Sequence, residues 1–284
     1  FNATGIHTRY HTKKNEKTSD LCIAAAEHLI KNINWDKKSI DGIIFLTQTP
    51  DKKLPGSAFR IQKALGLTDN TFAFDINLGC SAYPYGLWIA GSLMQTGAKR
   101  VLILAGDTIS KLINKDDRGT SFLFGDAGSA TAIDVSKENK WEFILGSDGS
   151  GYESIKADFK DSLVMEGSKV FEFALSRIPP LIKRIDNDNF KKHDLYFFHQ
   201  ANKFMLSYLK RKCKIADNSF PININKYGNT SSASIPLLMT DYFQKNLINK
   251  NLRIALIGFG VGFSWAAASL KLRPECFFDT IFLE

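Results

Sequence analysis

Long apolar segments are missing from this chain of 284 residues. No run of about 18 apolar residues occurs, which excludes an obvious membrane-spanning helix. The first residues, Phe1 to Gly5, have neither the basic nor the apolar region of a signal peptide. We therefore expect a soluble, cytoplasmic protein that makes no contact with a membrane. Because the chain begins with Phe1 and not with Met, we also expect native sequence upstream of it.

Clustered cysteines are also missing. The four cysteines are scattered along the chain, with no CxxC pair and no His/Cys cluster at metal-binding spacing. We therefore expect reduced thiols, no disulfide framework and no bound metal. The formal charge of +8 comes without aromatic RNP strings, zinc fingers or basic heptads, so nucleic acid is not an expected partner. A solvated basic surface is the simplest reading, and such a surface can attract an acidic protein.

What the chain does contain is an alternation of strand-like and helix-like segments, several of the strands apolar throughout. Such strands are typical of an α/β protein whose sheets are covered on both faces. A Gly-rich turn precedes a small-residue strand at 124–133 and again at 258–267, which favours two similar halves, 1–140 and 141–284, in one compact body. The expected helices lie near 18–31, 56–65, 80–96, 170–185 and 201–212, and the expected strands near 40–46, 72–77, 100–105, 195–198 and 251–257.

Cys80 is the most informative residue, because it stands between an apolar strand and a long helical segment. Free backbone N–H groups and the positive end of the helix dipole converge at such a junction, and both favour a thiolate. A thiolate is a nucleophile. The plainer interpretation is a small buried hydrophobic residue, which describes most free cysteines.

Two further residues that could take part in catalysis also stand where one predicted element ends and the next begins. His199 follows the apolar run 195–198, and Asn229 lies in a turn that leads into a small-residue helix. Sites in α/β proteins form at the carboxyl ends of strands, so Cys80, His199 and Asn229 could converge. Taken alone, a histidine after an apolar strand is more often a satisfied core residue, and an asparagine after glycine is more often part of a turn or a cap.

Seven ordered motifs resemble the β-ketoacyl-[acyl-carrier-protein] synthase III family of the thiolase superfamily. The resemblance extends from Thr4 to about Leu272. The motifs are Asp75-Ile-Asn-Leu-Gly-Cys80-Ser-Ala-Tyr, Asp117-Arg-Gly-Thr, Phe124-Gly-Asp-Ala-Gly, Met165-Glu-Gly, His199-Gln-Ala-Asn, Tyr227-Gly-Asn-Thr-Ser and Gly258-Phe-Gly-Val-Gly-Phe-Ser-Trp.

The resemblance implies a five-layer α-β-α-β-α fold of two similar halves, usually a homodimer. It also implies an acyltransferase that begins fatty acid synthesis without a permanently bound cofactor. Its substrates would be acyl-CoA, a CoA thioester, and malonyl-acyl carrier protein. By resemblance, Cys80 would carry the acyl group, and His199 with Asn229 would stabilise the enolate formed as the malonyl group loses CO2. Backbone N–H groups of Cys80 and Val261 would form the oxyanion hole.

Further roles follow from the same resemblance. Arg118 would contact the CoA nucleotide, and Asn202 would order water or the phosphopantetheine arm. Arg211 and Lys212 would face the acidic carrier protein. A surface ion pair would explain Arg118 equally well, and an exposed helix face would explain Arg211 and Lys212.

Other functions stay open at this stage. Phe204 departs from the basic residue common in the family, and residues 273–284 extend past its usual last strand, so a synthase III-like enzyme of a specialised biosynthetic pathway is an alternative. A papain-like cysteine protease is a remote one, since it shares the order Cys, His, Asn. A nucleotide-binding module is suggested weakly by Gly258-x-Gly-x-Gly262.

Overall fold

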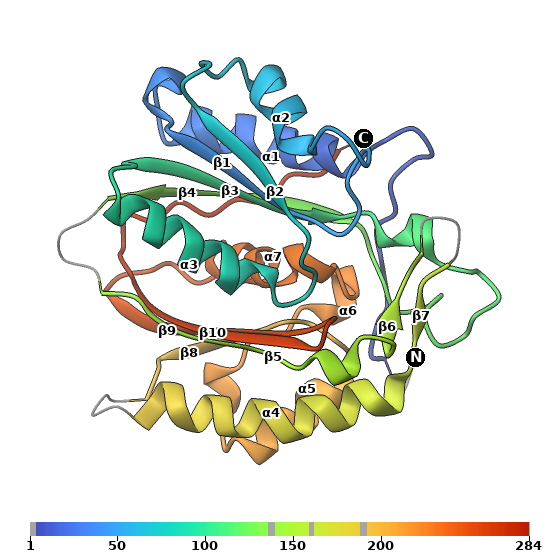
Figure 1. Cartoon of the computed structure of the whole chain (residues 1–284). Helices are drawn as coiled ribbons and strands as arrows, with labels where there is room; N and C mark the ends of the chain where they lie inside the picture. Colours follow the sequence, from blue (N-terminus) through green and yellow to red (C-terminus); the bar gives the residue numbers. More distant parts are fainter. Residues whose placement is uncertain (1–3, 136–139, 159–161, 188–191, 284) are drawn as a thin grey trace.

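The computed structural model describes residues 4–135, 140–158, 162–187 and 192–283. Figure 1 shows five layers, in the order helix, sheet, helix, sheet, helix. Helices α1 and α2 form one outer layer, α3 and α7 lie between the two sheets, and α4 and α5 form the other outer layer. The expected α/β class and five-layer architecture are confirmed. The helix bounds are α1 Thr18–Asn32, α2 Ser57–Leu65, α3 Ala82–Gln95, α4 Gly167–Asn187, α5 Lys203–Lys212, α6 Ile224–Tyr227 and α7 Ser234–Phe243.

The first sheet has the strand order β2-β1-β3-β4. Its strands β1, β2 and β3 are parallel and β4 runs antiparallel to β3. Every residue of β1 is buried, as its unbroken apolar sequence requires of a strand covered on both faces. The bounds are β1 Gly42–Leu46, β2 Phe72–Ile76, β3 Arg100–Asp107 and β4 Ala127–Asp134.

The second sheet has the order β5-β10-β9-β8. Strands β8 and β9 are parallel, and β10 pairs antiparallel with β9 and with β5. A separate small sheet pairs β6 with β7. The bounds are β5 Glu142–Ser147, β6 Ile155–Lys156, β7 Val164–Met165, β8 Leu195–Phe198, β9 Leu252–Gly260 and β10 Ser264–Leu272.

Local sequence explains where the helices begin and end. Gly66 ends α2 with a φ of 64°, a left-handed conformation that costs glycine little. The Asn202 side chain accepts a hydrogen bond from the Met205 N–H and so caps α5. No helix in the described parts of the chain is long and apolar enough to cross a membrane.

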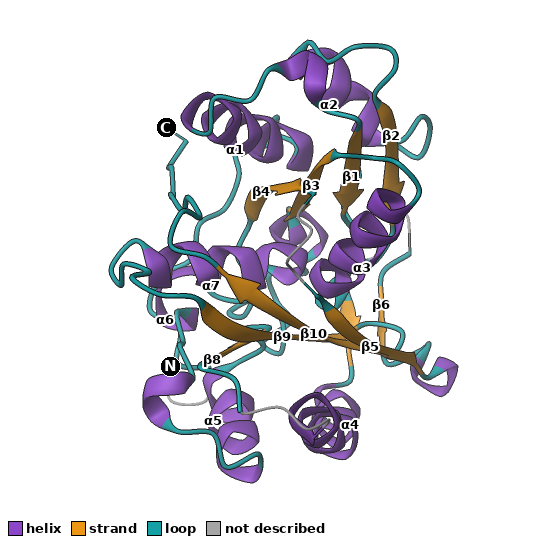
Figure 2. Ribbon diagram, turned by 90° about the vertical axis from the view of Figure 1, so that its left-hand side faces the viewer, coloured by secondary structure: helices purple, strands orange, loops and turns teal. Residues whose placement is uncertain are grey.

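The boundary predicted between residues 140 and 141 stays a prediction, and the two main sheets lie on either side of it. The segment that follows β10 returns to the first half and ends near α1 (Figures 1 and 2). There Asp279 pairs with His28 of α1 at 2.6 Å, Phe278 packs on Phe243 of α7, and Phe282 packs on Tyr10. This final segment therefore ties the central and outer helices together.

Candidate active site

One cavity between the two halves is lined by Cys80, His199 and Asn229. Val261 and Asn202 line the same cavity. The structure therefore brings together five of the residues singled out in the sequence. Much of the remaining wall is apolar and includes Ile109, Leu123, Phe124, Ile155, Leu163, Met165, Val170, Met205 and Phe259.

Cys80 lies between β2 and α3 and packs against β9. A Cβ atom placed on Gly260 would lie 2.8 Å from the Cys80 Cβ and 3.2 Å from its Sγ, so glycine is needed for this close approach. Gly258 allows the same approach to the Cys80 carbonyl oxygen and to Ser81. Two glycines of the motif at 258–262 thus make room for the nucleophile.

The sequence suggested a lowered pKa for Cys80, and the surroundings in the structure act in the opposite direction. Burial, with the Asp107 carboxylate nearby, raises the pKa of Cys80 to about 12, although a hydrogen bond to Ser231 acts in the opposite direction. Helix α3 begins at Ala82, two residues later than expected, so Cys80 directly precedes Ser81, the N-cap of that helix. The half-buried Cys80 thus has a raised pKa in the free enzyme, opposite in direction to the shift that the junction suggested.

His199 stands directly after β8 and is 2% exposed. Burial lowers its pKa to about 3, so the imidazole is neutral at physiological pH. Its Nδ1 lies 2.8 Å from the Ser234 hydroxyl, which also accepts a hydrogen bond from the Gln200 N–H. With the Ser234 hydroxyl donating to Nδ1, the proton of the ring is on Nε2. The edge-to-face contact with Phe259, at 5.6 Å between ring centroids, fixes the ring further.

Asn229 is held by its backbone and by its own side chain. Its backbone N–H donates to the Leu123 carbonyl and its carbonyl accepts from Gly125. The side-chain Oδ1 accepts a hydrogen bond from the Ser231 N–H at 2.9 Å. This bond assigns the amide orientation and directs the donor group, Nδ2, away from that contact. His199 and Asn229 can therefore each present an N–H donor.

Val261 and Asn202 line the cavity and also form hydrogen bonds that hold the local backbone. The Val261 carbonyl accepts a hydrogen bond from the Ser264 hydroxyl at 2.6 Å, within the turn from β9 to β10. Asn202 caps α5. The Gly258-x-Gly-x-Gly262 run connects two antiparallel strands and is not followed by a helix, so it is not a dinucleotide-binding loop.

Three predicted binding residues lie outside the cavity wall. Arg118 is exposed on a loop whose neighbour Asp117 accepts hydrogen bonds from the Gly119 N–H and the Thr120 hydroxyl. Arg211 and Lys212 are exposed in the last turn of α5, with the Arg211 guanidinium 5.8 Å from the Tyr208 ring centroid. The N-terminal end of the same helix reaches the cavity through Met205.

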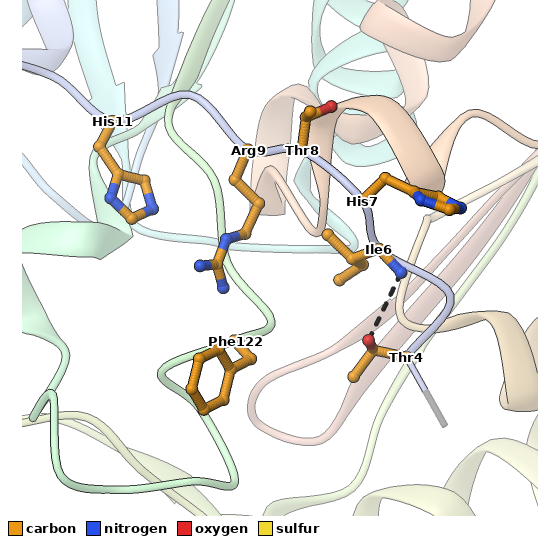
Figure 3. A pocket seen from close by; sticks show the side chains of 7 residues that line it. All are labelled: Thr4, Ile6, His7, Thr8, Arg9, His11 and Phe122. Carbon is orange, nitrogen blue, oxygen red and sulfur yellow. Dashed lines mark hydrogen bonds between the residues drawn. The ribbon is translucent and has the colours of Figure 1, made fainter. Parts of the chain in front are cut away.

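A second pocket lies between the N-terminal segment and the loop that carries Phe122 (Figure 3). Arg9 points from that segment toward Phe122 and donates a hydrogen bond to the Ser121 carbonyl. The pocket is lined by Thr4, Ile6, His7, Thr8, Arg9, His11 and Phe122. This lining has more cationic character than the wall around Cys80.

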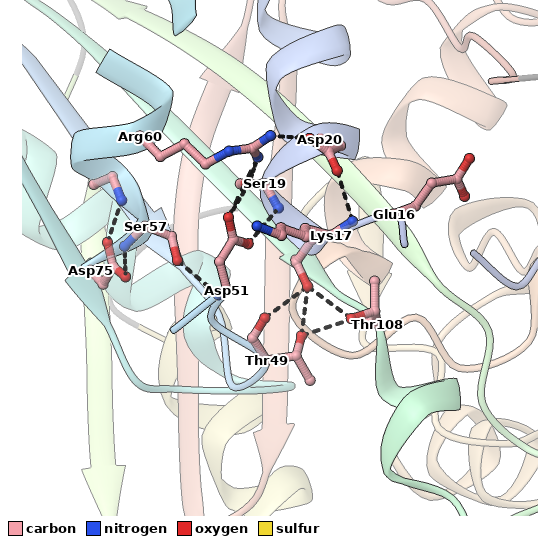
Figure 4. Close-up of polar contacts among 12 residues, drawn as sticks. Glu16, Lys17, Ser19, Asp20, Thr49, Asp51, Ser57, Arg60, Asp75 and Thr108 are labelled. Atoms are coloured by element: carbon pink, nitrogen blue, oxygen red, sulfur yellow. Dashed lines mark hydrogen bonds and ion pairs between the residues drawn. The ribbon is translucent and has the colours of Figure 1, made fainter. Parts of the chain in front are cut away.

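Sequence reasoning missed three buried polar residues beside the cavity: Asp107, Ser231 and Ser234. The Gln48 N–H, in the loop after β1, donates a hydrogen bond to Asp107. The polar contacts drawn in Figure 4 hold the next part of this loop, at Thr49 and Asp51. In that network Thr18 bonds to Thr49, and Arg60 bridges Asp20 and Asp51. The signal that could have found Asp107 is a carboxylate that ends an otherwise apolar strand, since burying it requires donors from neighbouring elements.

No group of three His, Cys, Asp or Glu side chains in the described ranges could hold a metal ion.

Known proteins resemble this chain over most of its length. Two models of 3-oxoacyl-[acyl-carrier-protein (ACP)] synthase III match it, one at residues 74–149 and the C-terminal one at 186–272. The β-ketoacyl-[acyl-carrier-protein] synthase III of Streptococcus agalactiae is 36% identical over 288 residues, which cover 95% of this chain and 88% of the relative.

Solved structures agree with these sequence relatives. The 3-oxoacyl-(acyl-carrier protein) synthase of Burkholderia xenovorans LB400 superposes with a TM-score of 0.93 at 42% identity, over 96% of this chain and 85% of that one. The β-ketoacyl-[acyl-carrier-protein] synthase III of Thermus thermophilus gives 0.89 at 31% identity, over 96% and 90%. These relatives give no support to a protease or to a nucleotide-binding module.

Proposed function

This chain belongs to the 3-oxoacyl-[acyl-carrier-protein] synthase III family, and from that premise we propose how its own residues perform the condensation that begins fatty acid synthesis. An acyl-CoA primer acylates Cys80, and malonyl-acyl carrier protein then reacts with the acyl-enzyme to give a β-ketoacyl-carrier protein and CO2. The observation that supports these roles is the apolar cavity that Cys80, His199 and Asn229 share.

The first half of the reaction is an acyl transfer. The Cys80 sulfur attacks the thioester carbonyl carbon, and the C–S bond to CoA breaks. Negative charge develops on the carbonyl oxygen as the sulfur adds. We assign its stabilisation to the backbone N–H groups of Cys80 and Val261, which belong to the two segments that meet at Gly260.

The second half is a decarboxylation followed by carbon–carbon bond formation. As the malonyl group loses CO2, charge moves onto its thioester oxygen. His199 Nε2–H and Asn229 Nδ2–H donate to that oxygen, and because the charge grows along the reaction they stabilise the transition state more than the substrate. The carbanion then attacks the carbonyl carbon of acyl-Cys80, and the C–S bond to Cys80 breaks as the new C–C bond forms, which releases the β-ketoacyl product and frees the Cys80 sulfur. A neutral imidazole suits this role, because it donates a hydrogen bond without having to carry a charge in a buried site.

Substrate binding would extend outside the cavity. We assign the nucleotide of CoA to the loop of Arg118, whose residue Phe122 lines the pocket of Figure 3 beside Arg9. Asn202 would contact the phosphopantetheine arm at the start of α5. Arg211 and Lys212, exposed at the other end of that helix, would face the acidic carrier protein. The thioester is already activated, so this chemistry requires no resident cofactor.

We also propose a homodimer, located in the cytoplasm with its substrates. Strand β2 is an edge of the first sheet and carries half-buried Phe72 and Phe74. Helix α3, which covers the same sheet, leaves Trp88 44% exposed. A second copy placed along β2 would pair this edge and cover that surface. Sedimentation at micromolar concentration should give twice the mass of one chain, and a single-chain mass would contradict the dimer.

The mass of the intact protein tests the acyl-enzyme. Incubation with a panel of acyl-CoA donors should add one acyl group to the protein, and peptide mapping should locate it on Cys80. The variant Cys80→Ala should gain none, while Cys213→Ala is the matched control and should be acylated like the parent. An unchanged mass across the whole panel would contradict the proposed function.

A further inference from the structure

The turn that carries Asn229 is joined to the loop at residues 121–125. The Asn229 N–H donates to the Leu123 carbonyl at 2.9 Å, and the Gly125 N–H donates to the Asn229 carbonyl at 3.0 Å. A Cβ atom placed on Gly125 would overlap the Tyr227 carbonyl oxygen, so the two backbones are in close contact. The position of the Asn229 side chain in the cavity therefore depends on how this loop and this turn are held together.

Arg9 contacts both of these elements. Its Nη1 donates a hydrogen bond to the Ser121 carbonyl at 2.8 Å, and its guanidinium carbon lies 5.8 Å from the Phe122 ring centroid (Figure 3). Its aliphatic stem lies against Gly228, the residue before Asn229, because a Cβ atom placed there would lie 3.0 Å from the Arg9 Cγ and 3.3 Å from its Cδ. Gly228 has a φ of 68°, which glycine adopts at little cost. Arg9 thus holds the loop with its guanidinium and the turn with its stem.

The backbone on both sides of Arg9 is anchored to the same two elements. Before Arg9, the Thr8 hydroxyl donates to the Lys226 carbonyl at 2.7 Å. After Arg9, the Tyr10 carbonyl accepts a hydrogen bond from the Asp126 N–H at 2.8 Å. A side chain that extends from a fixed backbone loses less conformational freedom when it makes its contacts. The contacts of half-buried Arg9 therefore belong to the fold and are not those of a mobile surface arginine.

We propose that Arg9 is a positioning residue for the decarboxylation and that it acts through Asn229. By holding the loop at Ser121 against the turn at Gly228, Arg9 keeps the Asn229 Nδ2–H directed at the thioester oxygen on which the enolate charge develops. The hydrogen bond from the Ser231 N–H to Oδ1 sets how the amide group is turned, and Arg9 sets where that group lies. A displacement of about 1 Å at such a group costs about 10²-fold in rate.

Acylation of Cys80 does not use this arrangement. The nucleophile lies at the junction between β2 and α3, and Val261 lies in the turn from β9 to β10. Arg9 lines the pocket of Figure 3, whereas Cys80 and Val261 line the other cavity. Loss of Arg9 should therefore separate the two half-reactions. The inference rests on the proposed function, because Arg9 supports the decarboxylation that is assigned there.

The experiment measures both half-reactions in variants of Arg9. Arg9→Ala removes the stem and the guanidinium, and Arg9→Lys keeps a stem and a donor. Arg9→Met keeps only the stem and takes the place of Arg9→Ala if thermal unfolding shows that Arg9→Ala is not folded. Arg100→Met is the matched control, because Arg100 also donates a hydrogen bond and lies 4.9 Å from an aromatic ring, that of Trp35, but at the end of β3 away from the cavity.

Two features of the design separate positioning from other effects. Acylation by acyl-CoA and release of labelled CO2 from malonyl-carrier protein are both measured at saturating substrate, because Phe122, beside Arg9, belongs to the loop assigned to the CoA nucleotide. Arg9→Ala is also combined with Asn229→Ala. An effect that acts through Asn229 disappears when the amide group is absent, whereas a general structural effect remains.

We expect Arg9→Ala to slow CO2 release by about 10²-fold, with Arg9→Met slowed less, while acylation of both stays within a few-fold of the parent. Arg9→Lys and Arg100→Met should resemble the parent in both half-reactions, and Arg9→Ala should cause no further loss in Asn229→Ala. CO2 release at the parent rate by folded Arg9→Ala or Arg9→Met would overturn the inference. An equal loss in both half-reactions, or the same loss with and without Asn229, would also overturn it. If the parent itself is not acylated or releases no CO2, the proposed function fails instead.

Discussion

At the scale of single residues, burial decides the charge state of the site. The pKa of His199 is lowered from 6.5 in water to about 3 in the folded chain. Between these values the unfolded chain binds a proton that the folded chain does not, so this residue lowers folding stability as the pH falls from about 6.5 toward 3. Above about pH 6.5 it contributes no pH dependence to stability.

The same shift predicts the pH dependence of the second half-reaction. Release of CO2 from malonyl-carrier protein by pre-acylated enzyme should show no acid limb from His199 between about pH 5 and 8, because the ring stays neutral throughout. Single-turnover measurements of labelled CO2 test this, with His199→Gln as the comparison variant that keeps an N–H donor. An acid limb centred near 6.5 that disappears in His199→Gln would show that the ring titrates and would contradict its neutral role.

The sequence allowed Cys80, His199 and Asn229 to be chosen because each follows an apolar strand or a turn and each matches a family motif. It did not reveal that the surroundings raise the pKa of the Cys80 thiol, since the chain gives no measure of how deeply a junction is enclosed. Asp107, Ser231 and Ser234 were missed for a related reason. Their roles arise from contacts between residues far apart in sequence, such as Ser232 with Asp107.

At the scale of elements, β9 determines where the nucleophile sits. Gly260→Ala would place a methyl group 2.8 Å from the Cys80 Cβ, closer than side-chain atoms pack, so the junction between β2 and α3 must move. We expect acylation of Cys80 to fall by about 10²-fold, as when a reacting group is displaced by about 1 Å. Gly149→Ala is the control, because a Cβ there meets nothing within 4 Å. Acylation of a folded Gly260→Ala protein at the parent rate would contradict this role of the glycine.

Element positions were predictable where apolar periodicity was strong. Strand β8 was expected at 195–198 and lies there, and α2 ends at the expected Gly66. The short strands β6 and β7 were not expected, since two residues carry too little pattern to distinguish a strand from a loop. The strand orders could not be read from composition either, because an apolar run does not identify its neighbours.

At the scale of the whole molecule, two similar sheets hold one cavity between them. The first contributes the junction of Cys80, and the second contributes His199 and the turn of Val261. Asn229 joins the two, because its backbone pairs with residues 123–125 while its side chain lines the cavity. The two half-reactions thus depend on residues from both halves, which explains why neither half of the sequence alone indicates the chemistry.

One measurement tests most directly whether Cys80 carries the acyl group while His199 and Asn229 act in the decarboxylation. His199→Ala and Asn229→Ala are incubated with the acyl-CoA that acylates the parent, and then with malonyl-carrier protein labelled in its free carboxyl group. Both variants should still gain one acyl group on Cys80, while release of labelled CO2 falls by about 10² to 10³-fold, the usual loss on removing one oxyanion donor. Normal CO2 release by both variants would show that these residues do not stabilise the enolate and would contradict the account.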